Sequence, residues 1–177
     1  MSSKLVAYFS ATGMTRAVAT LLADFTGADL RAIRPTVPYT RADLDWRDGH
    51  SRSSLEMDGV LPWAGMEGAP WDLRGYDVVF VGFPIWWYTA PTIIRTFLSS
   101  CDFTGKTVHL FATSGGSGFG RTSEYLRPLL AADAVLREGI VLQDVNGSEL
   151  MAWLSTIDVL PGLWGGAPAG LLGALSG

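Results

Sequence analysis

Apolar residues along this chain form short continuous runs, and these alternate with segments in which apolar residues recur at helical spacing. Continuous runs at residues 5–9, 78–83 and 107–112 predict strands buried on both faces, with further strands at 28–33 and within 135–142. Helical spacing predicts helices at residues 13–25, 90–98 and 148–157 and one through Leu126, Leu129 and Leu130. In the first helix the expected apolar face holds Met14, Val18, Leu21, Leu22 and Phe25.

Alternation of strands and helices predicts a parallel sheet joined by right-handed crossovers, and therefore a three-layer α/β sandwich. Ligands of such folds bind outside the carboxyl ends of the strands. We therefore expect unusual chemistry in the turns that follow the first, third and fourth strands. The pattern weakens over residues 36–75, where we expect a helix around residues 41–48 and a solvated surface made by the mixed charges of residues 41–52.

Composition and charge narrow the class of protein. With 177 residues, 48% hydrophobic and 17% charged, the chain is expected to form one domain over residues 1–177, ending in a Gly/Pro-rich tail at 158–177. The net charge of −4 and the lack of a basic block argue against a nucleic-acid partner. A single cysteine, Cys101, excludes an intrachain disulfide and fits a cytoplasmic location. We expect no signal peptide, no membrane span and no metal site.

The first unusual turn follows the strand at residues 5–9. Its candidate binding residues are Ser10, Thr12, Gly13, Met14 and Thr15. A strand that turns directly into a helix leaves the first helical N–H groups unpaired, and together with the helix dipole they favour a phosphate. The alternative is that the hydroxyl side chains merely cap the helix.

The second unusual turn follows the strand at residues 78–83. Its candidate binding residues are Pro84, Ile85, Trp86, Trp87 and Tyr88. Three aromatic rings in succession are expected to stack on a ligand, although the two tryptophans would also suit the core or a dimer interface.

The third unusual turn follows the strand at residues 107–112. Its candidate binding residues are Thr113, Ser114, Gly115, Gly116 and Gly118. Its glycines allow the backbone to approach a flat ligand closely. A phosphate site, aromatic stacking and backbone donors together predict a mononucleotide with a large ring system, and FMN is the best match.

Three motifs in order, Ser-x-Thr-Gly-x-Thr, Pro-Ile-Trp-Trp-x-x-x-Pro and Thr-Ser-Gly-Gly-Ser-Gly, resemble those of flavodoxin-like proteins, more narrowly the small flavodoxin-like oxidoreductases, over roughly residues 4–157. The resemblance implies a five-stranded parallel sheet of order 2-1-3-4-5 and noncovalent FMN. It implies that the phosphate is held by Ser10, Thr12, Gly13 and Thr15. It also implies that Trp86, Trp87 and Tyr88 pack near the isoalloxazine, whose polar edge is lined by Ser114, Gly115, Gly116 and Gly118.

Two residues depart from the family pattern. Met14 stands where the family usually has asparagine, so the backbone N–H must serve that position. Tyr88 stands where the family usually has glycine, and a tyrosine is expected to resist a positive φ.

The implied function is an oxidoreductase in which FMN passes hydride or electrons from NAD(P)H to a quinone-like acceptor. Because the cofactor performs the chemistry, no protein acid or base is assigned. One alternative is a flavodoxin-type carrier that serves a redox protein, although the mild charge and Tyr88 argue against it. Another is a member that binds no flavin. A surface containing Trp63, Trp71 and Trp164 would suit a homodimer.

Overall fold

A computed structural model describes residues 3–160, and a sheet of five parallel strands forms its centre. The strands are β1 (Lys4–Tyr8), β2 (Asp29–Ala32), β3 (Val78–Pro84), β4 (Thr107–Thr113) and β5 (Val135–Leu142). Their spatial order is β2-β1-β3-β4-β5, which confirms the predicted topology. Because every neighbouring pair is parallel, all five carboxyl ends lie at one edge of the sheet.

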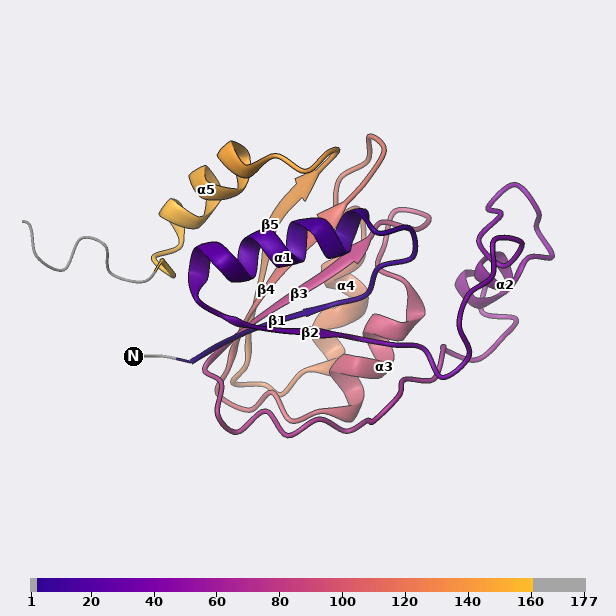
Figure 1. Ribbon diagram of the computed structural model, residues 1–177. Helices are drawn as coiled ribbons and strands as arrows, with labels where there is room; N and C mark the ends of the chain where they lie inside the picture. Colours follow the sequence, from indigo (N-terminus) through magenta and orange to yellow (C-terminus); the bar gives the residue numbers. More distant parts are fainter. Residues whose placement is uncertain (1–2, 161–177) are drawn as a thin grey trace, which may run out of the picture.

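Helices cover both faces of this sheet. They are α1 (Met14–Thr26), α2 (Arg52–Met57), α3 (Thr92–Ser100), α4 (Thr122–Leu126) and α5 (Gly147–Thr156). Helices α1 and α5 pack on one face, and α3 and α4 pack on the other (Figure 1). The three-layer architecture predicted from the alternating pattern is therefore confirmed. The helix expected to continue through Leu130 is shorter, because a 3₁₀ turn that contains Pro128 follows Leu126.

The helix expected around residues 41–48 is wrong. This segment forms consecutive hydrogen-bonded turns, and the helix begins only at Arg52. Thr40 and Asp43 exchange side chain–backbone hydrogen bonds of 2.8 and 3.1 Å. Such local bonds compete with a helical ladder, which explains the difference.

Two apolar layers flank the sheet, and β3 contributes to both. Phe80 faces α1 and α5, whereas Val79, Val81 and Phe83 face α3 and α4. Burial on both faces is the reason for the continuous apolar run in the sequence. Met14 departs from the predicted apolar face: it is the first residue of α1 and is 40% exposed.

The connection from β2 to β3 contains α2 and projects beyond the carboxyl edge of the sheet (Figure 1). Trp63, Trp71 and Trp164 were expected to share an exposed surface, but the structure does not place Trp63 and Trp71 on one. Trp71 is buried, Trp63 is exposed, and Trp164 lies outside the described residues. Over residues 3–160, none of the helices has both the length and the apolar character needed to cross a membrane.

Candidate functional site

The three unusual loops meet at the carboxyl edge of the sheet because β1, β3 and β4 are adjacent. They are called here the first loop (residues 10–15), the second loop (84–91) and the third loop (113–121). Figure 1 shows them at the same end of the molecule as the projecting β2–β3 connection. The strand order creates this shared site, because it places the first loop beside two loops that follow it by roughly 70 and 100 residues in the chain.

The first loop presents the start of α1 without a side-chain cap. Gly13 stands at the N-cap in the left-handed region, with φ of 100° and ψ of −13°. No side chain within residues 3–160 accepts a hydrogen bond from the first helical turn. Ser10 Oγ instead accepts from the N–H of Gly13 at 3.1 Å, and Thr12 is exposed. The capping alternative therefore does not describe this turn, and its N–H groups can receive an anion.

Thr15 connects the first loop to the third. Its hydroxyl oxygen lies 2.8 Å from that of Thr113, and both residues are buried. Met14, the residue that precedes Thr15, turns its side chain to solvent instead. Of the five residues predicted in this loop, the structure thus directs Thr15 inward and leaves Met14 outside.

The second loop is a tight hairpin. The backbone groups of Trp86 and Thr89 exchange hydrogen bonds of 2.9 and 3.1 Å. Between them Trp87 and Tyr88 both adopt positive φ, 47° and 62°. The expectation that Tyr88 would resist this region is wrong, because the two-residue turn requires left-handed backbone at both of its central positions.

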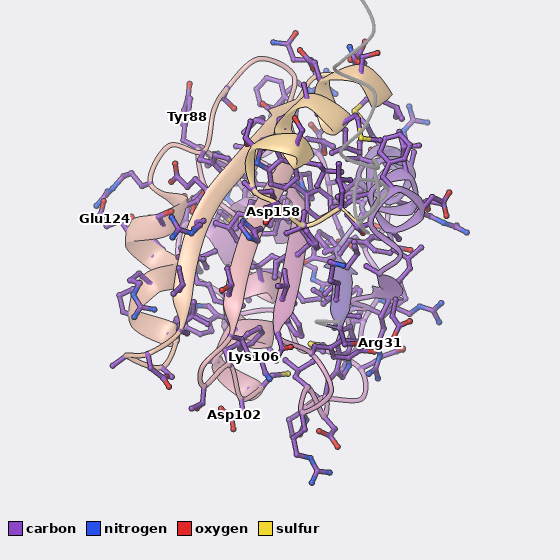
Figure 2. All side chains as sticks on the ribbon, turned by 90° about the vertical axis from the view of Figure 1, so that its left-hand side faces the viewer. Arg31, Tyr88, Asp102, Lys106, Glu124 and Asp158 are labelled. Atoms are coloured by element: carbon purple, nitrogen blue, oxygen red, sulfur yellow. The ribbon has the colours of Figure 1, made fainter. Side chains whose placement is uncertain are left out.

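The rings of the second loop differ in exposure: Trp86 is half-buried, whereas Trp87 and Tyr88 are exposed. Trp86 packs edge-on against Phe9 and Tyr39, with centroid distances of 5.7 and 5.5 Å. Trp87 is 41% exposed and Tyr88 is 70% exposed. Figure 2 shows Tyr88 projecting from the body of the molecule. The two exposed rings are free to meet a ligand, whereas Trp86 belongs to the packed wall beneath them.

Backbone contacts anchor the second loop to the third. Ile85, just after Pro84 at the end of β3, donates its N–H to the carbonyl of Thr113 at 2.9 Å, and Arg121 donates its N–H to the carbonyl of Tyr88 at 3.0 Å. Gly120 lies so close that an added Cβ would stand 2.2 Å from that same Tyr88 carbonyl oxygen. The two loops therefore form one continuous wall.

The third loop is organised by Ser114. Its Oγ accepts from the N–H groups of Gly116 at 3.2 Å and Ser117 at 2.9 Å. A Cβ added at Gly115, Gly116 or Gly118 would meet no atom of the described residues within 4 Å, so these residues leave the space over the glycines open. A flat ligand can approach this backbone closely.

A buried ionic cluster behind Trp86 was not foreseen. The Tyr39 hydroxyl donates to Glu56 at 2.5 Å, and Arg52 Nε donates to the same carboxylate at 2.8 Å. Burial and the adjacent Glu56 carboxylate raise the pKa of Tyr39 well above its usual range. Arg52 was expected on a solvated surface, yet its side chain is 18% exposed. The only local signal was the Arg52–Glu56 spacing of four residues, which suits a helical ion pair.

Other candidate groups are accounted for structurally. His109 is buried and stacks on Phe80 with centroids 5.5 Å apart, and Cys101 is buried in the core. Arg121 pairs with Glu124 on the surface. Among the described residues no cluster of His, Cys, Asp or Glu could hold a metal ion.

Comparisons with known proteins agree on one family. A family model described as flavodoxin matches residues 3–157. A provisionally assigned flavoprotein from Bacteroides eggerthii is 44% identical, with a TM-score of 0.81 over 89% of this chain and 98% of that chain. No curated protein sequence matches.

Two more distant structures share the fold. One is a flavoprotein from Lactobacillus acidophilus in complex with FMN, at 20% identity and a TM-score of 0.63, covering 86% of this chain and 99% of that chain. The other is an NADH:FMN oxidoreductase, at 16% identity and a TM-score of 0.50, covering 91% of each chain.

Proposed function

We propose that this chain, which belongs to the flavodoxin family, binds FMN across its three loops and transfers hydride or electrons from a nicotinamide donor to a quinone-like acceptor. The observation that carries the proposal is the meeting of an uncapped helix start, exposed aromatic rings and open glycine backbone at one edge of the sheet. Proteins of this fold that hold FMN or act on it support the same assignment.

The first loop suits the phosphate of FMN. The N–H groups of the first turn of α1 lack side-chain acceptors within the described part of the chain, and the helix dipole adds a positive potential. We assign Ser10, Thr12, Gly13 and Thr15 to this end of the cofactor, with Met14 contributing only its backbone N–H.

The second and third loops suit the ring system. Trp87 and Tyr88 present exposed rings, and the third loop offers backbone N–H groups at Gly115, Gly116 and Gly118. The buried Thr89 Oγ1 has no hydrogen-bond partner among the described residues, which leaves one polar atom of the second loop available for a ligand.

The protein's part in the reaction is to bind, orient and exclude water. FMN, when bound, supplies the hydride and electron chemistry. Trp86 is held by Phe9 and Tyr39, so it gives the second loop a fixed base. On this base the strained turn at Trp87 and Tyr88 shapes the side from which donor and acceptor approach.

The decisive experiment is anaerobic reduction of the FMN-loaded protein. Rapid bleaching of the flavin absorbance by NADPH or NADH is expected. If neither donor bleaches the flavin while dithionite does, the protein is a carrier that receives electrons from a redox protein. If FMN does not bind at all, the cofactor assignment is wrong.

A pair of glycine variants tests the phosphate end separately. Gly13 and Gly59 both have positive φ, at 100° and 76°, and an added Cβ would meet nothing within 4 Å at either position. Both Gly13→Ala and Gly59→Ala should therefore lose about 1 kcal/mol of stability through backbone strain. Only Gly13→Ala should also weaken FMN binding, by roughly tenfold, and equal FMN affinities would contradict the assignment.

A further inference from the structure

A cavity of about 380 Å³ lies beside the first loop, on the side of β2. Ser10 and Gly13 of the first loop line it, together with Arg16 of α1 and Arg34, which follows β2. Among residues 3–160, Arg16 and Arg34 are the charged residues that line it. The cavity therefore carries two positive charges and opens next to the proposed phosphate site.

Neither arginine is neutralised by an acidic group of the described residues. Over residues 3–160 the guanidinium groups of Arg16 and Arg34 form no ion pair, whereas those of Arg52 and Arg121 are each paired with a glutamate. Arg16 and Arg34 are both exposed, so their positive charges are open to an anion that arrives from solvent. The residues that line this cavity give it the charge that an anionic ligand needs.

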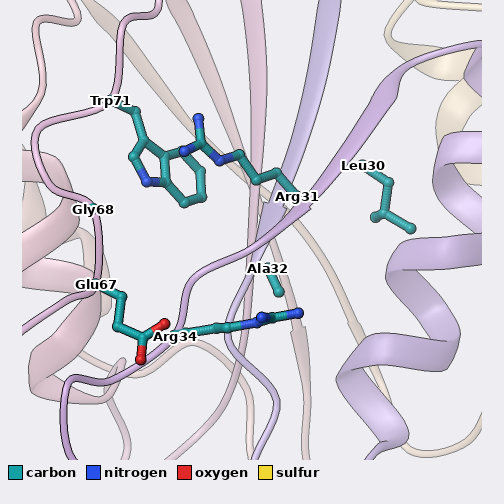
Figure 3. A pocket seen from close by; sticks show the side chains of 7 residues that line it. All are labelled: Leu30, Arg31, Ala32, Arg34, Glu67, Gly68 and Trp71. Atoms are coloured by element: carbon teal, nitrogen blue, oxygen red, sulfur yellow. The ribbon is translucent and has the colours of Figure 1, made fainter.

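The positive surface continues along the outer edge of the sheet. A second cavity, of about 490 Å³, shares Ala32 and Arg34 with the first and adds Arg31, whose guanidinium carbon lies 3.8 Å from the centroid of the Trp71 ring. Within the part of the chain that the structure describes, Glu67 is the one acidic residue that lines it. Figure 3 shows the Arg34 guanidinium group extending away from the Glu67 carboxylate and passing below Ala32.

We propose that Arg16 and Arg34 form an anion subsite that binds a phosphate group of the dinucleotide donor, an inference that rests on the proposed function. Guanidinium groups pair with phosphate through two parallel hydrogen bonds and stay charged at every physiological pH. The subsite shares Ser10 and Gly13 with the first loop and extends from there toward Arg34 after β2, so the FMN phosphate and a donor phosphate would be neighbours. Two such anions repel each other, and the two arginines offset that repulsion.

The donor offers two kinds of phosphate, the pyrophosphate bridge of NADH and NADPH and the 2′-phosphate of NADPH alone. Both present negatively charged phosphate oxygens to a guanidinium group, so the structure assigns this class of ligand and the experiment distinguishes the source. If the 2′-phosphate binds there, Arg16→Gln and Arg34→Gln should each raise the KM for NADPH about tenfold and leave that for NADH unchanged. If the pyrophosphate binds there, both KM values should rise together.

A matched control variant and a donor without phosphate test whether the arginine substitutions act only through the donor phosphate or also disturb the fold and the flavin site. Arg137 on β5, at the opposite edge of the sheet, is exposed, so Arg137→Gln makes the same charge change away from the subsite. This variant should keep both KM values. With 1-benzyl-1,4-dihydronicotinamide, which carries no phosphate, all three variants should react like the unaltered protein. An equal loss with this donor would overturn the proposal.

Direct binding separates the subsite from the proposed reaction. Adenosine 2′,5′-bisphosphate, titrated into FMN-loaded protein by calorimetry, should bind about tenfold more weakly to each arginine variant. If it binds as expected but neither NADPH nor NADH reduces the flavin, the oxidoreductase proposal and the donor assignment fail and an anion site remains. If the variants instead weaken FMN binding, the arginines serve the FMN phosphate and the proposal is overturned.

Discussion

The hydroxyl oxygens of Thr15 and Thr113 lie 2.8 Å apart, although 98 positions separate the two residues in the chain. Thr15 belongs to the first turn of α1 and Thr113 ends β4, so this one hydrogen bond joins the first loop to the third. Both residues are buried, so water cannot replace a lost partner.

Thr15→Val should destabilise the protein by about 1–3 kcal/mol, because the Thr113 hydroxyl is left buried without a partner. The double variant Thr15→Val/Thr113→Val should recover most of that loss, since neither hydroxyl then remains. Urea unfolding of the four proteins, without added FMN, measures the coupling. Losses that simply add in the double variant would show that the hydrogen bond is not formed.

Gly120→Ala should disturb the wall between the second and third loops. Its Cβ would stand 2.2 Å from the Tyr88 carbonyl oxygen, and the backbone of Gly120 has a positive φ of 55°. We expect a loss of about 1–3 kcal/mol in stability and weaker FMN binding, because the Tyr88 turn must move.

Gly75→Ala is the control for this change, because a Cβ there would meet nothing within 4 Å and no positive φ is required. Fluorescence titration with FMN and thermal unfolding give the two readouts. Unchanged FMN affinity in Gly120→Ala would separate this contact from the site.

Tyr39 should make the protein sensitive to alkali. Burial, followed by the hydrogen bond to Glu56, raises the pKa of the Tyr39 phenol above its ordinary value of 10. Above pH 10 the phenol ionises in the unfolded chain but stays protonated in the folded one, so stability falls as the pH rises, by about 1.4 kcal/mol per pH unit.

Tyr39→Phe should remove this alkaline loss, at a cost of about 1.5–3 kcal/mol near neutral pH for the lost hydrogen bond to a carboxylate. Unfolding between pH 7 and pH 11, with the tyrosinate absorbance followed in parallel, tests it. The same alkaline slope in both proteins would be evidence against a protonated Tyr39.

His109 should lower the stability of the protein at acidic pH, whereas Tyr39 lowers it at alkaline pH. Burial, and secondarily the charge of Arg137, lower the pKa of His109 below its ordinary value of 6.5. As the pH falls below about 6.5, His109 becomes protonated in the unfolded chain but stays neutral in the folded one. The stability of the protein therefore declines until the pH reaches the lowered pKa of His109 in the folded state.

His109→Phe keeps an aromatic ring beside Phe80 and removes the titrating group. Its stability should depend less steeply on pH between 7 and 5 than that of the unaltered protein. Denaturant unfolding over this range measures the difference, and parallel curves would mean that His109 takes up its proton equally well in the folded and the unfolded chain.

The β2–β3 connection separates what was predictable from what was not. The charge pattern of residues 41–48 is compatible with a helix, but the hydrogen bonds between Thr40 and Asp43 stabilise turns instead. The burial of Glu56 likewise depends on contacts that the local pattern of apolar residues does not reveal. Trp71 similarly was expected at the surface, and only the fold places it beneath Arg31.

The pattern of residues by itself predicted the parallel α/β sheet, the three loops and the type of ligand they suit, and the resemblance to flavodoxin-like proteins added the strand order. Strands that are buried on both faces require continuous apolar runs. The conformation and binding groups of a turn depend on a few consecutive residues, so both features can be recognised from the sequence. Tertiary structure alone decided that Trp86 packs inward while Tyr88 points outward with positive φ, and that Arg16 and Arg34 share a cavity. These outcomes depend on aromatic packing, desolvation and charge between segments far apart in the chain, whose juxtaposition exists only after folding.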